Sequence, residues 1–127
     1  MSGGTIIVKP VKNSNLISNQ NAIIGNTVLY GATNGKLYAS GKAGERFAVR
    51  NSGGISVVEG CGSNGCEYMT GGKIVILGDV GDNFAAGMTG GMAFIYDPDK
   101  KFENYVNPQS VIWQHVETDY WKKYWKI

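Results

Sequence analysis

The feature that most constrains the fold of this chain is a hydroxyl residue followed by two glycines, repeated at a nearly fixed spacing. Copies lie at residues 52–54, 70–72 and 89–91, so successive copies are 18 and 19 residues apart. An apolar run rich in β-branched residues follows each copy at once. A fixed period with one strand-like run per unit is typical of a solenoid.

The apolar runs recur in two sets. The first occupies residues 36–41, 55–60, 73–78 and 92–97, and a similar run lies at 3–8. The second set falls between them, at residues 45–49, 66–69 and 83–88. We therefore predict two short strands per turn, each pairing in parallel with its counterpart one turn later. The gaps are too short for the crossover helices of a Rossmann-type unit.

An antiparallel β-sandwich is the competing architecture, because glycine-rich turns about every nine residues also suit it. A sandwich does not require the same dipeptide to return every 18 or 19 residues, whereas a solenoid does. Residues at the same place in successive turns should then stack. The sequence predicts two such stacks, Phe47 with Tyr68 and Phe84, and Val57 with Val75 and Phe94.

Glycine makes up 19 of the 127 residues, about double its usual share of roughly 7%. The glycines stand at the ends of apolar runs, where a corner requires a positive φ or a close backbone approach. We interpret one group of them as structural corner residues rather than a ligand loop. They are Gly35, Gly41, Gly53, Gly54, Gly60, Gly71, Gly72, Gly78, Gly90 and Gly91.

Composition and charge argue against several classes of function. The net charge of +2 is too small to favour a nucleic-acid partner, and no apolar run approaches the ~20 residues needed to cross a bilayer. The N-terminus lacks a basic segment and an apolar export signal, so we expect a cytoplasmic protein with reduced thiols at Cys61 and Cys66. These two cysteines and the distant His115 do not make a four-ligand zinc site.

The composition changes after residue 97. Residues 98–127 hold all three tryptophans and the only histidine. We interpret residues 1–127 as a single domain in which 98–127 form an aromatic-rich extension that ends in a short helical cap. An end of a solenoid exposes unpaired backbone and must be covered, and this extension is a natural cover or docking surface.

Several residues invite a chemical interpretation, and for most a structural one is simpler. Cys61 and Cys66 resemble a redox pair, but Cys66 also fits a small buried position. His115 lacks a partner fixed by sequence, and residues 41–46 lack the spacing of a phosphate loop. The basic and aromatic residues 122–125 suit a capping helix better than a nucleic-acid surface. We predict no catalytic, cofactor-binding or metal-binding residue.

One charged group is harder to treat as inert. Glu45, Arg46 and Arg50 lie in a strand-like context beside Asn51. We predict an interface there, formed by a ladder or an interdomain ion pair.

These blocks together resemble a known family. The segments GERFAVRNSGG (44–54), GCEYMTGG (65–72) and GDNFAAGMTGG (81–91) are similar to the C-terminal GXGXG domain of the glutamate synthase large subunit. GNTVLYGATNGKLYASGKA (25–43) and YVNPQSV (105–111) match it in the same order. The resemblance covers residues 2–120 in long ordered blocks, and is therefore specific.

The resemblance implies a right-handed single-stranded parallel β-helix, all-β, with about five to six turns of 18–19 residues. It also implies a non-catalytic assembly role beside the amidotransferase domain and the synthase domain, as domains or separate subunits. The whole enzyme makes glutamate from glutamine and 2-oxoglutarate, and its synthase domain carries FMN and an iron–sulfur cluster.

This chain departs from the complete enzyme where chemistry is concerned. It begins Met-Ser instead of with a nucleophilic cysteine, and it lacks the three-cysteine cluster motif. We therefore expect no activity and no cofactor in this chain alone, and a short protein, a split gene product or a fragment. Two alternatives are a self-associating β-helix module, which would form a homo-oligomer, and a subunit related to the C subunit of formylmethanofuran dehydrogenase.

Overall fold

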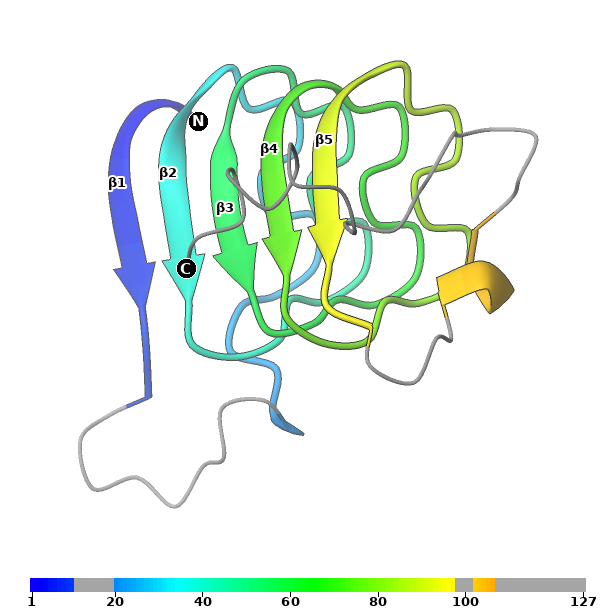
Figure 1. The fold of residues 1–127 in the computed structure, drawn as a ribbon. Helices are drawn as coiled ribbons and strands as arrows, with labels where there is room; N and C mark the ends of the chain where they lie inside the picture. Colours follow the sequence, from blue (N-terminus) through cyan, green and yellow to red (C-terminus); the bar gives the residue numbers. More distant parts are fainter. Residues whose placement is uncertain (11–19, 98–101, 107–127) are drawn as a thin grey trace, which may run out of the picture.

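The computed structural model describes residues 1–10, 20–97 and 102–106. Five strands form one sheet in the order of the sequence, and every neighbouring pair is parallel (Figure 1). The strands are β1 (Ser2–Val8), β2 (Asn34–Ala39), β3 (Ile55–Val58), β4 (Thr70–Ile76) and β5 (Gly90–Ile95). The parallel pairing predicted for the first set of apolar runs is confirmed.

The register between strands reproduces the sequence period. Lys36 pairs with Ile55, Ile55 with Lys73, and Lys73 with Met92, which are steps of 19, 18 and 19 residues. The protein is therefore an all-β solenoid with about three regular turns from β2 to β5. The larger number of turns and the right-handed sense remain predictions.

The side of each turn opposite the sheet is not a strand, and here the prediction was wrong. Four segments, 27–31, 46–50, 64–68 and 83–87, have a positive φ at their first, third and fifth residues. We call them the left-handed segments. A strand needs φ near −120° throughout, so this alternation excludes the predicted second set of strands.

Backbone hydrogen bonds still join the left-handed segments from turn to turn. The Ala48 N–H donates to the Val28 carbonyl of the turn before (2.9 Å), and the Arg50 N–H donates to the Glu67 carbonyl of the turn after (2.8 Å). The segments thus form a second ladder, in which the donors at residues 46, 48 and 50 alternate in direction.

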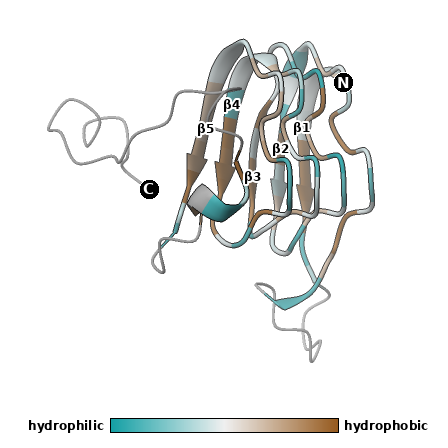
Figure 2. Cartoon of the chain, turned by 90° about the vertical axis from the view of Figure 1, so that its right-hand side faces the viewer, coloured by the Kyte–Doolittle hydropathy of each residue, from teal (hydrophilic) through white to brown (hydrophobic). Residues whose placement is uncertain are grey.

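The core lies between the sheet and the left-handed segments. Inward residues of the strands, such as Leu37, Ile74 and Ile76, meet Phe47 and Phe84 from the opposite side. Figure 2 views the molecule from its β5 end, and much of β5 and the C-terminal half of β4 are coloured as apolar. Burying this apolar surface is the main favourable term in folding.

The predicted stack of Phe47, Tyr68 and Phe84 needs correction. Phe47 and Phe84 are both buried, but the residue between them in register is Gly65, while Tyr68 is 56% exposed. The second predicted stack is confirmed in register, since Val57 pairs with Val75 and Val75 with Phe94. It alternates with buried residues, so it lies on the outer face of the sheet rather than inside.

Two buried polar side chains are fully paired with the backbone. Asn51 donates from Nδ2 to the carbonyls of Gly54 (3.0 Å) and Gly71 (3.3 Å), and its Oδ1 accepts from the Gly54 N–H (3.0 Å). Ser56 donates from Oγ to the Leu37 carbonyl (2.7 Å). A buried polar group without such partners would be costly, and these bonds tie successive turns together.

The described part ends in a short 3-10 helix, η2 (Phe102–Asn104), whose first N–H donates to Asp97 Oδ2 at 2.9 Å. Phe102 packs edge-on against Phe84, with ring centroids 5.7 Å apart. No α-helix occurs in the described residues, and none of their helices has the length and apolar character needed to span a bilayer. The predicted helical cap and His115 lie outside the described residues.

Candidate interface

The glycines singled out from sequence lie in columns beside the strands. Gly53, Gly71 and Gly90 occupy equivalent positions, and a Cβ on any of them would collide with a backbone carbonyl oxygen of the preceding turn. The carbonyls belong to Thr33, Ser52 and Thr70, the hydroxyl residues of the sequence motif or its equivalent. These turns approach so closely that the column has no room for a side chain.

The next column follows a different requirement. Gly35, Gly72 and Gly91 have φ values of 104°, 86° and 79°, which L-residues with side chains adopt only with strain. At Gly54 a Cβ would lie 2.7 Å from Asn51 Oδ1. Another group lies where the first set of apolar runs ends: Gly41, Gly60 and Gly78. We interpret all of these glycines as structural residues that shape the corners of the turns.

The predicted interface residues gather at one left-handed segment. Arg46 and Arg50 are its first and last residues, with φ values of 58° and 56°, and both side chains are exposed. Glu45 precedes them and is also exposed, and its backbone N–H donates to Asn26 Oδ1 at 2.8 Å. Within the described residues neither arginine forms an ion pair.

Tyr68 is a candidate that the sequence analysis missed as a surface residue. It stands one turn after Arg50, at the same position of its segment, with φ of 54°. A Cβ on Gly87, one turn further, would lie 2.6 Å from the Tyr68 ring, so the ring covers that glycine. The fifth residues of the four left-handed segments are Gly31, Arg50, Tyr68 and Gly87. The two glycines in this column are the sequence signal that Tyr68 occupies a positive-φ position.

The two cysteines face the core and are free thiols. Burial raises the pKa of the Cys61 thiol to about 12, partly offset by a hydrogen bond from the Gly81 backbone. Burial also raises the pKa of Cys66, and the nearby Cys61 adds to the effect. A reactive or metal-binding cysteine needs an accessible thiolate, which neither site favours. The buried position predicted for Cys66 is confirmed.

The described residues do not supply the ligands of an iron–sulfur cluster. An iron–sulfur cluster is held by several cysteine thiolates, and no group of three or more metal-ligating side chains occurs in the described part of the chain. The hollow beside Gly78, Ile95 and Phe102 has a volume of about 10 Å³, far below the ~300 Å³ at which small-molecule sites begin.

The segment 41–46 has the glycines and basic residues of a phosphate-binding loop, but not its spacing. Such a loop uses the N-terminus of a following helix. Here it leads instead into a left-handed segment, and Lys42 lies against Gly60, whose Cβ would be 3.0 Å from the Lys42 Cγ. The residues 122–125 lie outside the described residues.

These features define a parallel β-solenoid whose described residues include no group of three or more metal-ligating side chains. The chain belongs to the GXGXG motif family, whose model matches residues 1–126.

The relatives are glutamate synthases. The chain is 66% identical over 122 residues, 96% of its length, to "Glutamate synthase [NADPH] large chain" of Azospirillum brasilense. It is 54% identical over 120 residues to the protein of that name from Bacillus subtilis (strain 168), which covers 94% of this chain. It is also 54% identical over 118 residues, 93% of its length, to "Ferredoxin-dependent glutamate synthase" of Antithamnion sp.. The chain spans about 8% of the length of each of these relatives.

Proposed function

We propose that this chain is a structural and assembly domain of a glutamate-synthase-type enzyme, without catalytic activity of its own. Homology to glutamate synthase large chains supports the enzyme context. Support for the structural role comes from the stacked glycines, the buried thiols and the lack of a metal-ligating cluster in the described residues. The partners would be the amidotransferase and synthase domains, and FMN and the iron–sulfur cluster would belong to the latter.

The main observation behind the proposal is the strained, positive-φ backbone at Arg46, Arg50 and Tyr68. The left-handed conformation costs an L-residue roughly 1–2 kcal/mol. At buried positions such as Ala48 and Cys66 the side chain fills the core. The two arginines are exposed and Tyr68 is mostly exposed, so their side chains bury little surface. Strain of this kind clusters at functional sites, and we infer that the side chains are kept for contacts with a partner.

The residue types fit this inference. Arginine and tyrosine are enriched among the residues that dominate the energy of protein interfaces. The two arginines make no ion pair within the described part, so their charges are available to carboxylates on a partner. Glu45 beside them would accept a cation from the same partner.

The proposal is tested in a chimera, the Azospirillum brasilense large chain carrying this sequence in place of its matching segment. Arg50→Glu should weaken the packing between domains, seen as faster limited proteolysis at the domain junctions. Lys9→Glu makes the same charge change at an exposed site outside the left-handed segments and should leave the cleavage rate unchanged. Unchanged cleavage in Arg50→Glu would refute the interface.

The variant Arg50→Gly distinguishes the cost of the strained backbone at residue 50 from the loss of a side-chain contact with the partner. In the 127-residue chain it should raise the free energy of unfolding in urea by about 0.5–1 kcal/mol, because glycine accepts a positive φ. In the chimera the same change should speed cleavage between domains. Lys36→Gly, at an exposed strand position, is the matched control and should lower stability instead.

Homo-oligomerisation and a cytoplasmic location remain predictions. The observation that bears on the first is β1, which is exposed along almost its whole length, with Ile6 and Ile7 at 49% and 67% exposure.

A further inference from the structure

The sequence contains two Asn-Gly dipeptides, Asn34-Gly35 and Asn64-Gly65, and the fold holds them in different ways. Asparagine followed by glycine is the dipeptide that deamidates most readily without an enzyme, because glycine has no Cβ to shield the backbone nitrogen that attacks the side chain. Neither dipeptide has a part in the assembly role proposed above. The backbone around each one decides whether the reaction proceeds in the folded protein.

At the first dipeptide the attacking atom already lies beside the side chain. The Gly35 N–H donates to Asn34 Oδ1 at 2.9 Å. Because Oδ1 is about 1.2 Å from Cγ, the Gly35 nitrogen is no further than about 4.1 Å from the carbon that it would attack. Asn34 is exposed, and its terminal torsion is of the broad sp³–sp² kind. The side-chain amide can therefore turn its carbonyl carbon toward this nitrogen.

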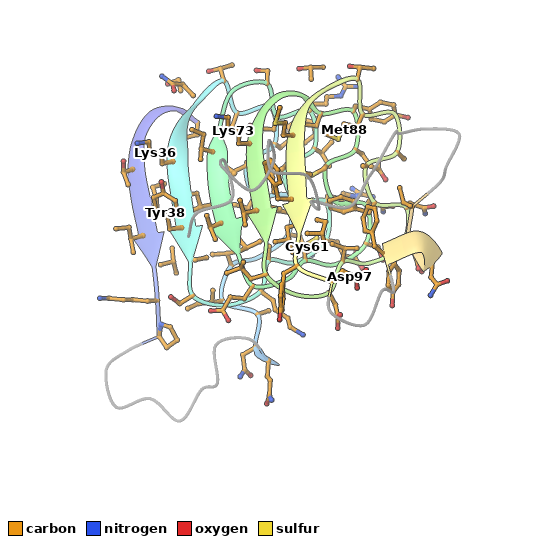
Figure 3. All side chains as sticks on the ribbon, in the orientation of Figure 1. Lys36, Tyr38, Cys61, Lys73, Met88 and Asp97 are labelled. Atoms are coloured by element: carbon orange, nitrogen blue, oxygen red, sulfur yellow. The ribbon has the colours of Figure 1, made fainter. Side chains whose placement is uncertain are left out.

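The strand opposite the first dipeptide leaves room for the backbone to move. The register between β1 and β2 shifts here, so that Gly3 and Gly4 together lie opposite Gly35. Such a bulge disrupts the ladder locally and leaves the extra residue unpaired. A Cβ on Gly3 or Gly4 would meet nothing within 4 Å. Figure 3 labels Lys36 and Tyr38, which follow the dipeptide along β2.

The second dipeptide is fixed by the neighbouring turns. Asn64 begins a left-handed segment, and its N–H donates to the Asp82 carbonyl at 2.8 Å. The Gly65 carbonyl accepts from the Ala85 N–H at 2.8 Å. Gly65 is buried, and a Cβ there would lie 3.0 Å from Cys61 Sγ. Turning this peptide to close a ring would break the stacking bonds, so reaction here requires local opening.

We propose that Asn34 is a site of spontaneous deamidation in the folded protein, whereas Asn64 is protected by the stack. The Gly35 nitrogen loses its proton to hydroxide and bonds to Asn34 Cγ. The bond from Cγ to Nδ2 breaks, and Nδ2 takes a proton from water and leaves as ammonia. Water then opens the resulting five-membered succinimide at either carbonyl. One product is aspartate at position 34, and the other is isoaspartate, whose backbone runs through the former side chain.

Isoaspartate would loosen the first turn, because it adds a methylene group to the backbone. The N–H groups of Thr33 and Asn34 both donate to the Met1 carbonyl, at 2.8 and 3.4 Å, and Asn34 also pairs with Ser2. A longer backbone at position 34 displaces these contacts with β1. Both products also lower the net charge of the chain from +2 to +1.

Peptide mapping of the 127-residue chain by mass spectrometry tests the proposal. The chain is incubated at pH 8 with and without guanidinium chloride, and circular dichroism follows the sheet. Digestion in ¹⁸O-labelled water marks any deamidation that occurs during digestion. In the folded chain Asn34 should deamidate at least about tenfold faster than Asn64, because Asn64 must wait for local opening. In denaturant the two rates should agree within about threefold, because the dipeptides are the same and the stack is gone.

Two outcomes would overturn the inference. One is a similar rate at Asn34 and Asn64 in the folded chain. The other is a rate at Asn34 that folding slows by about tenfold or more, since that would mean that this site also needs local opening. As a control, Asn34→Gln should remove the main acidic species that ion-exchange chromatography separates from the aged chain.

Hydrogen exchange tests the effect on the first turn. The deamidated chain is compared with Asn34→Asp, which has the same charge without the additional methylene group. Exchange in β1 should be at least about threefold faster in the deamidated chain, while β3 and β4 stay unchanged. Equal exchange in β1 of the two proteins would refute the loosening.

Discussion

Cys61 and Cys66 lose water on folding without gaining a cationic neighbour that would stabilise a thiolate. Burial therefore favours the neutral thiol and raises the pKa of both. A group whose pKa is higher in the folded state stabilises the fold while it stays protonated in both states. That contribution is complete below pH 9, the ordinary value, and is lost as the pH rises toward 12 at Cys61.

We expect the Cys61 thiol to lower the free energy of unfolding by roughly 1.4 kcal/mol per pH unit between pH 9 and pH 12. Urea titrations at pH 8, 9.5 and 10.5 would measure this. Tyrosines and lysines also titrate in this range, so the comparison is with Cys61→Ala. That variant should start less stable at pH 8 and lose stability less steeply. Equal slopes of stability against pH in the two proteins would show that burial does not raise the pKa of the Cys61 thiol.

The column of Gly53, Gly71 and Gly90 governs how closely turns approach. At Gly71 a side chain would meet the Ser52 carbonyl oxygen, a rigid part of the neighbouring turn. Gly71→Ala should therefore force the turns apart and lower the free energy of unfolding by about 2–3 kcal/mol. Gly25→Ala is the matched control, because a Cβ there meets nothing within 4 Å. Denaturation of both variants in urea is the measurement, and an equal effect in the two would contradict the steric argument.

Strands β3 and β4 could be predicted from the sequence because two independent signals coincide in them. Residues 55–58 and 73–76 are rich in β-branched side chains, and both segments follow a Gly-Gly pair at a fixed spacing. The opposite side of the turn could not be predicted from hydropathy. Phe47 and Val49 suit a strand, but they alternate with positive-φ residues such as Ala48, and the stacking of turns overrides local preference.

The residues of the candidate surfaces could be predicted from the sequence to different degrees, because some have a local signal and others depend on the stacking of turns. Arg46 and Arg50 stand out in the sequence as charges within an apolar context. Tyr68 reads as a core aromatic until the register places it in the column of Gly31 and Gly87. The outward position of Val57 and Val75 follows only from the pairing of their strands together with knowledge of which face of the sheet is buried.

The described solenoid is close to one-dimensional, since each of its strands pairs only with the strands of the neighbouring turns. Stability in such a protein is a sum over turns and the interfaces between them, and the ends open first. We expect hydrogen exchange to be slowest in β3 and β4 and at least 100-fold faster in β1, whose side chains are exposed almost throughout. Mass spectrometry of peptic fragments after exchange would measure the gradient. Uniform protection across the five strands would indicate global unfolding instead.

The first turn also shows where a solenoid accepts additional sequence. Val8 pairs with Ala39 and Ala22 pairs with Lys42, so fourteen positions of one turn match three of the next. The stretch between these two pairings is therefore eleven residues longer in the first turn than in the next, and both pairings are kept. A designer who wished to display a peptide on this scaffold would insert it at the equivalent corner of a later turn, after Ser40, Glu59 or Leu77.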